Sequence, residues 1–175
     1  MRQMRFFSIP VAATCYQILQ KFAVRCVGNL TMWCTEVREY RCQAPLRGTV
    51  LADKLRGVLP AIALDGHPAL TTAYMNDAEP LLTFAQQVNG YGKEEDTFLG
   101  ISTSGNSKNV LYAATVAKAK GLHVVGLTGQ KDSKLKDVAD VTIQVPQTET
   151  YMIQELHLPV YHCLCLMLED RFFEK

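Results

Sequence analysis

The sequence reads Thr97-Phe-Leu-Gly-Ile-Ser-Thr-Ser-Gly-Asn-Ser-Lys-Asn-Val110 near its middle. Its first five residues are mostly apolar, which is typical of a strand buried on both faces of a parallel sheet. A hydroxyl-rich turn follows at once, and apolar residues then recur at helical spacing from Ser107 to Lys120. This order predicts one strand-turn-helix unit of an α/β fold, with the turn at the sheet edge where such folds bind ligands.

The same pattern extends on both sides of this stretch. Short apolar runs predict further strands at 59–64, 122–127 and 138–145. A helix is predicted at 80–91, and Gly121 is predicted to end the helix that begins near Ser107. Alternating strands and helices predict a three-layer αβα fold, a doubly wound parallel sheet of the flavodoxin-like kind.

Composition narrows the function classes. The chain has 175 residues, a formal net charge of +1 and 48% hydrophobic residues, which excludes the disordered and collagen-like classes. A near-neutral balance gives no chain-wide attraction to nucleic acid or to anionic lipid. No apolar run is long enough to cross a bilayer, and the first residues do not resemble a signal peptide. We therefore expect a cytoplasmic protein that binds neither nucleic acid nor membrane.

The N-terminal third differs from the rest. Up to Val58 it carries nine Lys and Arg residues against three acids, together with four of the six cysteines. Only residues 11–22 look helical, and no period is sustained between 24 and 50. A basic arm for nucleic acid is one interpretation, and an irregular surface segment is the other. The six cysteines form no CxxC pair, so we expect reduced thiols. We divide the chain into an atypical segment, 1–54, and an α/β domain, 55–175.

The turn at 102–107 has the composition of a phosphate site. Gly105 permits tight backbone geometry, and the first amides of the following helix favour an anion. Four hydroxyl side chains could donate to it: Ser102, Thr103, Ser104 and Ser107. The same residue types also suit an N-capped turn that binds nothing, and composition leaves both readings open. A second polar turn, Thr128-Gly129-Gln130, would face the same edge.

Several motifs together resemble the sugar isomerase (SIS) domain. They are Gly100–Val110, Gly121–Gly129, Ala139-Asp140 and Val145-Pro146. Within that superfamily, Ile153–His162 and Tyr74–Asp77 are similar to the bacterial phosphoheptose isomerase family. The resemblance runs from about Leu55 to the C-terminus.

The resemblance implies a homotetramer that converts sedoheptulose 7-phosphate to D-glycero-D-manno-heptose 7-phosphate. The four hydroxyl residues of the 102–107 turn would hold the phosphate, and Asn76 and Asp77 would lie near the sugar hydroxyls. His162 would be the acid/base of the C-terminal helix, with Gln154 beside it. Some family members bind zinc through the equivalents of Gln154 and His162, so the resemblance allows this metal without requiring it.

The chemistry of the reaction agrees with this assignment. Aldose-ketose isomerisation through an enediol needs a base at carbon and a proton donor at oxygen, and histidine titrates in the right range. Gln154 and His162 are eight residues apart, about two helical turns, so they lie on neighbouring parts of one helix face. His157 on the same helix is interpreted as a core residue.

One block of the family pattern is missing. A Cys-Gly-Asn-Gly-Gly-Ser loop after the first strand, and a helix carrying His and the catalytic Glu, have no counterpart in residues 26–42. The first strand and loop of the sheet therefore look disrupted. Read in another frame, the codons of Thr35–Arg38 allow Gly-Gly-Ser. We hypothesise that a segment from about Phe22 to about Val50 is translated out of frame.

Three functions remain open. The first is a phosphoheptose isomerase, impaired in this copy because the family Glu is absent. The second is a non-catalytic SIS module that binds a sugar phosphate or a protein partner. The third is another SIS enzyme, acting on an amino-sugar or pentose phosphate.

Overall fold

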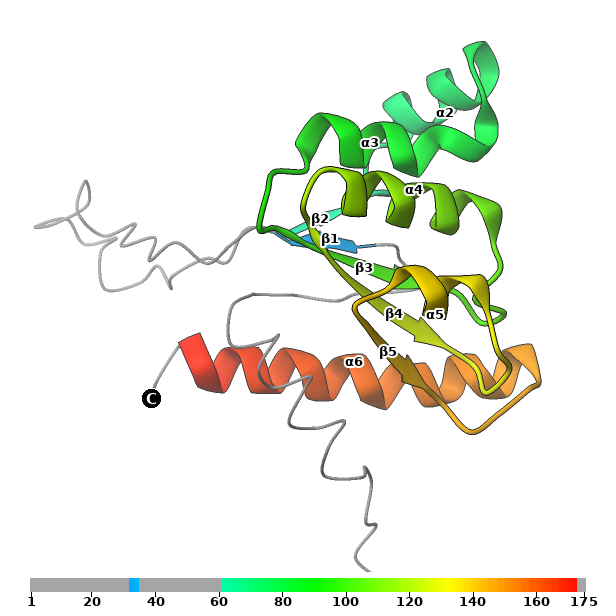
Figure 1. Ribbon diagram of the computed structural model, residues 1–175, viewed down its shortest axis with the longest axis vertical. Coiled ribbons are helices and arrows are strands. Elements are labelled where there is room, and N and C mark those ends of the chain that lie inside the picture. The colour runs from blue at the N-terminus through cyan, green and yellow to red at the C-terminus, as the bar shows by residue number, and fades with distance from the viewer. Residues whose placement is uncertain (1–31, 35–60, 173–175) are drawn as a thin grey trace, which may run out of the picture.

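The computed structural model describes residues 32–34 and 61–172. Most of the atypical N-terminal segment, including the helix expected at 11–22, lies outside the described residues. Where described, the chain forms one five-stranded sheet between two layers of helices (Figure 1). The strands are β1 (Met32–Cys34), β2 (Ala61–Ala63), β3 (Thr97–Ile101), β4 (His123–Thr128) and β5 (Val141–Gln144). The helices are α2 (Pro68–Asp77), η2 (Pro80–Leu82), α3 (Thr83–Tyr91), α4 (Lys108–Ala119), α5 (Lys134–Val138) and α6 (Thr150–Phe172).

The sheet follows the order β2-β1-β3-β4-β5, which is the flavodoxin-like order. Strands β3, β4 and β5 are parallel, as the sequence predicts. Strand β1 departs from the prediction of a wholly parallel sheet, because it pairs antiparallel with both β2 and β3. It belongs to the part of the chain in which no periodicity indicates a strand. Its carboxyl end therefore lies at the sheet edge opposite to that of β3.

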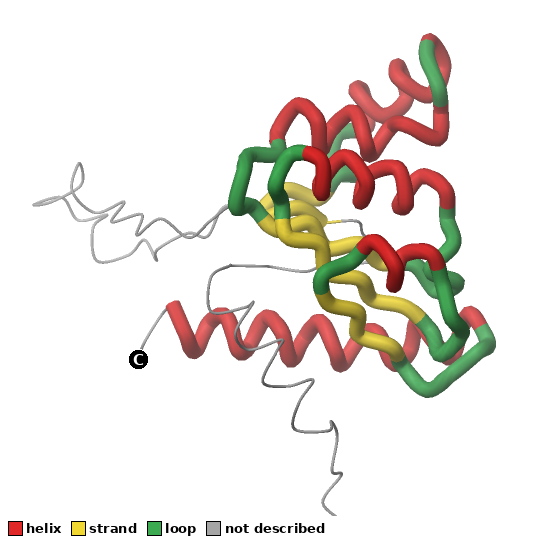
Figure 2. Tube along the Cα trace, viewed as in Figure 1, coloured by secondary structure: helices red, strands yellow, loops and turns green. Residues whose placement is uncertain are grey.

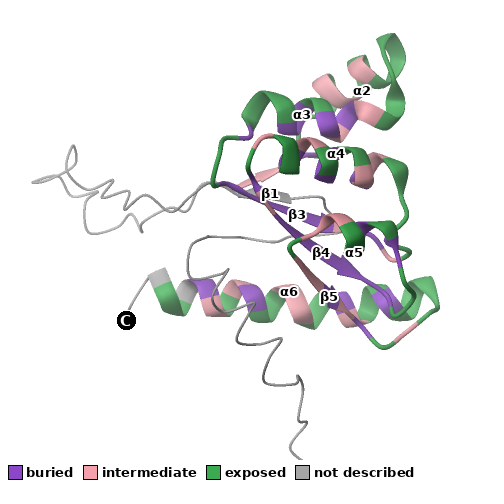
Figure 3. Cartoon of the chain, in the orientation of Figure 1, coloured by how far each residue is buried: buried purple, intermediate pink, exposed green. Residues whose placement is uncertain are grey.

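Strands β3 and β4 are buried on both faces, which explains why they are nearly continuous in apolar residues (Figure 3). Phe98 and Val124 belong to the core shared with α3, α4 and α5. Leu99 and Val125 belong to the core under α6. Successive side chains of a strand thus serve opposite helix layers, and the sheet is the middle layer of three (Figure 2).

Helix α4 lies close to the sheet because its inner face is small. Ala113, Ala114 and Ala117 are fully buried there. At the end of the helix Gly121 has φ +77°, with its N–H donating to Lys118 O and the N–H of Leu122 donating to Ala117 O. This is a Schellman motif, and it confirms the helix end predicted at Gly121.

The sequence pattern does not predict helices α2 and α5. Helix α2 begins after His67, whose Nδ1 accepts the N–H of Leu70 at 3.1 Å, with Pro68 as the first helical residue. Helix α5 is a short helix that ends at Val138, the first residue of the strand predicted at 138–145. That strand, β5, begins only at Val141.

Helix α6 covers the other face of the sheet alone among the described helices (Figure 1). Leu164 and Leu168 are buried against the sheet, whereas Leu166 is 67% exposed. Pro159 lies inside the helix and is exposed. Within the described ranges, no helix combines the length and the apolar character that a bilayer crossing requires.

This arrangement gives a matched test of the α6 contact. We expect Leu164→Ala to lower the free energy of unfolding by about 2–5 kcal/mol, because it leaves a cavity against β3 and β4. Leu166→Ala, on the solvent side of the same helix, should cost less than about 0.5 kcal/mol. Urea unfolding of both variants measures the difference, and equal losses would contradict the placement of α6.

Candidate functional site

The turn of residues 102–107, called the hydroxyl loop from here on, lies at the carboxyl end of β3. The N–H of Ser102 donates to Leu127 O at 3.0 Å, so the loop starts beside the end of β4. Helix α4 begins immediately after it, at Lys108. The loop thus occupies the edge that the sequence predicts for a ligand.

The four hydroxyl residues of this loop are not equivalent. Ser102 is 6% exposed, and its Oγ accepts the N–H of Gly105 at 3.1 Å. The same Oγ lies 3.0 Å from Ser107 Oγ. Ser104 and Ser107 are exposed, and Thr103 is half-buried. Ser102 therefore shapes the loop from inside, whereas Ser104 and Ser107 are accessible to a ligand.

The start of α4 is suited to an anion. Ser107 is the N-cap residue, yet its side chain makes no capping hydrogen bond. The N–H of Val110 is satisfied by Asn109 Oδ1 at 3.0 Å, and the first turn carries Lys108 and no acid. The amides of Lys108 and Asn109 precede the first bonds within the helix, and the helix dipole adds positive potential at this end. Exposed hydroxyls and helix amides thus converge on one small region.

Helix α5 fixes the loop from the side. The N–H of Lys134 donates to Asn106 Oδ1 at 3.1 Å, and the N–H of Leu135 donates to Gly105 O at 3.0 Å. Gly105 has φ +61°, and a Cβ there would lie 2.2 Å from Ser133 Oγ. Only glycine fits this position, for both conformational and steric reasons.

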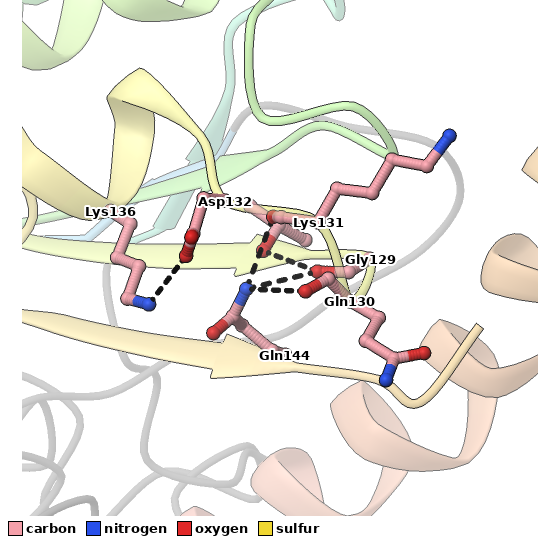
Figure 4. A network of polar contacts seen from close by, with 7 residues as sticks. Gly129, Gln130, Lys131, Asp132, Lys136 and Gln144 are labelled. Carbon is pink, nitrogen blue, oxygen red and sulfur yellow. Dashed lines mark hydrogen bonds and ion pairs between the residues drawn. The ribbon is translucent and has the colours of Figure 1, made fainter. Parts of the chain in front are cut away.

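The turn after β4 packs against the hydroxyl loop, as predicted from its sequence. The N–H of Gly129 donates to Thr103 O at 3.1 Å. Gln144 Nε2 lies within 3.4 Å of the carbonyl oxygens of Gly129, Gln130 and Lys131, and so holds the turn from β5 (Figure 4). Beyond the turn, Lys136 Nζ pairs with Asp132 Oδ1 at 2.9 Å. Two neighbouring turns are thus bound into one unit.

Helix α6 presents its predicted site residues to solvent. Gln154 and His162 are both exposed, and the His162 ring meets Tyr161 edge-on with 5.3 Å between centroids. At about 100° per residue, His162 points about 160° away from the buried Leu164. His162 therefore faces away from the sheet of its own chain.

The pair Asn76 and Asp77 lies elsewhere. Both residues end α2, and Asn76 Nδ2 donates to Asp77 Oδ1 at 2.6 Å. Helices α2 and α6 lie on opposite sides of the sheet (Figure 1). Among the contacts of the described residues, none links Asn76 or Asp77 to the hydroxyl loop or to the exposed Gln154 and His162.

His157 is the buried histidine of α6, at 3% exposure, as its interpretation as a core residue requires. Its Nε2 lies 3.2 Å from Thr128 O. Burial lowers the pKa of His157, while the bond to Thr128 acts in the opposite direction. The imidazole is therefore neutral near pH 7.

Sequence reasoning missed some of these supporting residues. Gln144 and Asn106 were not singled out, although each fixes a turn at the site through its side-chain amide. The one available signal was that Gln144 lies near the end of a predicted strand, close to the edge expected to bind a ligand. Side-chain hydrogen bonds that join distant segments leave no local pattern in a sequence.

Residues 46–129 match the SIS domain family. Phosphoheptose isomerase of Leptospira biflexa serovar Patoc is 43% identical over 118 residues, 67% of this chain and 60% of that protein. The chain carries a SIS domain. Phosphoheptose isomerase of Rhodospirillum rubrum is 42% identical over 127 residues, 73% of this chain and 66% of that protein.

A solved structure agrees with the sequence comparison. The structure of a phosphoheptose isomerase from Francisella tularensis matches with a TM-score of 0.62 at 38% identity, covering 65% of this chain and 63% of that one. The three-layer α/β fold of the SIS domain is thereby confirmed. The chain spans about 60% of the length of the L. biflexa protein.

Gly105 allows a test of the loop. We expect Gly105→Ala to cost at least about 1–2 kcal/mol of unfolding free energy from its positive φ alone, and to weaken phosphate binding by deforming the loop. Gly90→Ala is the matched control, because no atom lies within 4 Å of its Cβ position in α3. The control should be neutral or stabilising by up to about 1 kcal/mol. Urea unfolding and a phosphate titration measure both, and two neutral variants would contradict the loop geometry.

The pKa of His157 predicts a pH dependence of stability. In the unfolded chain this histidine takes up a proton near pH 6.5, whereas the folded chain holds it neutral to lower pH. Its contribution is therefore complete above pH 6.5 and is lost as the pH falls below it, by at most about 1.4 kcal/mol per pH unit. His157→Gln should flatten the stability curve just below pH 6.5. Unfolding in urea at a series of pH values measures this, and an unchanged slope in the variant would refute it.

Proposed function

We propose that the chain is a phosphoheptose isomerase, which interconverts sedoheptulose 7-phosphate and D-glycero-D-manno-heptose 7-phosphate. One observation carries the proposal, namely the hydroxyl loop at the start of α4. Ser104 and Ser107 are exposed there beside the first helix amides, and the buried Ser102 holds the loop in shape. The similarity to proteins named phosphoheptose isomerase supports sedoheptulose 7-phosphate as the substrate. We propose that the SIS domain spans residues 55–175. We also propose that the protein acts in the cytoplasm.

The reaction assigns a role to each predicted group. A base removes the proton from carbon 1 of the ketose, and an acid protonates the oxygen at carbon 2, which gives the enediol. A proton is then delivered to carbon 2 and another leaves the oxygen at carbon 1. His162 is proposed as the acid/base, with Gln154 beside it, and Asn76 and Asp77 as partners of the sugar hydroxyls. The hydroxyl loop would hold the phosphate far from the reacting carbons.

The proposed role of His162 depends on assembly. Because this side chain faces away from its own sheet, it can meet a bound sugar only where copies of the chain come together. The same side of α6 exposes Tyr151 at 66%, Leu158 at 42% and Leu166 at 67%. Exposed apolar side chains at this spacing along a helix support packing against another chain. We propose a homo-oligomer, a tetramer by family resemblance, which light scattering of the purified chain tests.

Zinc is not supported by the described residues. Catalytic zinc takes about three protein ligands, and Gln154 and His162 supply two. Among the residues described, no group of three His, Cys, Asp or Glu side chains gathers as a metal site. No step of the proposed reaction is routed through a metal.

A second candidate is a SIS module that binds a sugar phosphate or a protein without catalysis. The antiparallel direction of β1 favours it, because the carboxyl end of β1 lies at the edge opposite to the hydroxyl loop. The family's Gly-Gly-Ser loop and Glu, absent from this sequence, would otherwise complete the site after a first strand.

We propose that the segment from about 22 to 50 is out of frame. Resequencing and peptide masses that match the residues as given would refute this.

Two substitutions separate binding from catalysis. Ser104→Ala should raise the Kd for sedoheptulose 7-phosphate about 10- to 100-fold, because it removes about one charge-assisted hydrogen bond. His162→Ala should lower kcat by about 10²–10⁴-fold with little change in Kd, because it removes a proton donor. Calorimetry measures the first, and formation of the aldose measures the second. The assay uses the chain as it stands and a chain with a repaired upstream segment.

The matched control is Thr115→Ala, on the exposed side of α4, whose Oγ1 donates to Leu111 O. It should leave both quantities unchanged. Binding without turnover in both chains would favour the module over the isomerase. Equal, small effects of Ser104→Ala and His162→Ala in a competent chain would count against the assigned site.

A further inference from the structure

His157 is a buried polar group that the proposed reaction does not use. Among the four histidines of the chain it alone is buried, whereas His67 and His162 are exposed and His123 is half-buried. A buried imidazole without a partner would be costly, so the identity of its partner is informative.

The partner is the last carbonyl of β4. Thr128 O can only accept, so the Nε2 of His157 carries the hydrogen in the 3.2 Å contact, which fixes the tautomer. The same oxygen accepts the N–H of Val145 at 3.0 Å. One carbonyl thus joins α6, β4 and the residue that follows β5.

The next residue along the chain holds the hydroxyl loop. Gly129 N–H donates to Thr103 O at 3.1 Å. Ile153, one helical turn before His157, packs on the same glycine, since a Cβ on Gly129 would lie 2.5 Å from Ile153 Cδ1. Two side chains of α6 therefore fix the peptide that contacts the loop, one by packing and one by a hydrogen bond.

We propose that His157 is a positioning residue, which holds the Thr128–Gly129 peptide so that Gly129 keeps the hydroxyl loop in its anion-binding conformation. The inference rests on the proposed function, since it gives His157 a role in binding the phosphate of the substrate. Packing alone would be served by any apolar side chain of similar size. The hydrogen bond is what distinguishes the positioning role.

The test compares two substitutions in the full chain. His157→Phe keeps a ring and removes the donor, and His157→Gln keeps an N–H donor. We expect His157→Phe to raise the Kd for inorganic phosphate about two- to tenfold, the equivalent of one hydrogen bond, and to speed hydrogen exchange of the Gly129 amide. His157→Gln should restore most of both. Titration and exchange are followed by NMR.

Leu164→Ala is the matched control, because it loosens α6 against the sheet without touching the Thr128–Gly129 peptide. It should leave the phosphate Kd as in the unchanged chain. A folded His157→Phe variant with unaltered Gly129 exchange and unaltered phosphate Kd would overturn the proposal. So would a loss in Leu164→Ala as large as in His157→Phe.

A measurement on the unchanged chain covers the case in which His157→Phe does not fold. Phosphate should shift the Nε2 signal of His157, which must show the protonated-Nε2 tautomer. An Nδ1-protonated ring, or a Nε2 signal indifferent to saturating phosphate, would overturn the proposal. If the unchanged chain does not bind phosphate, the proposed function is refuted. In that case the exchange rate of the Gly129 amide in a folded His157→Phe variant still tests whether His157 holds the Thr128–Gly129 peptide.

Discussion

The hydrogen bond from Gly129 N–H to Thr103 O joins the turns that follow two adjacent parallel strands. Parallel pairing of β3 with β4 brings these turns to one edge, and the bond then fixes their separation. The hydroxyl loop, the start of α4 and the start of α6 are all positioned relative to this pair of turns. Because both strands are buried on both faces, the edge is the only place where their backbone can meet a ligand.

Much of the fold was predictable because burial leaves a local signature. The run Thr97–Ile101 has the same bounds in the structure as in the prediction, since both of its faces are covered and nearly every side chain must be apolar. Gly121 marked a helix end because a positive φ favours glycine. Strand β1 and helix α5 could not be foreseen, because three and five residues are too few to establish a period.

The candidate site was predicted unevenly for a related reason. The hydroxyl loop is contiguous in sequence, so its residues and its place at the sheet edge could be inferred together. The orientation of His162 could not, because spacing along a helix shows which residues share a face but not which face meets the sheet. Gln144 and Asn106 act across gaps of 13 to 28 residues, where no local pattern exists.

Pro159 separates the α6 residues that contact the Thr128–Gly129 peptide from the proposed acid/base, His162. A proline has no N–H, so the carbonyl of Glu155 lacks its usual donor four residues later, and bending the helix at this turn costs less than elsewhere. Ile153 and His157 lie before this point, and His162 lies after it. Leu164 and Leu168 anchor the second half of the helix to the sheet as firmly as Ile153 and His157 anchor the first. The missing hydrogen bond therefore falls between two anchored halves, where a bend would alter the angle between them without detaching either.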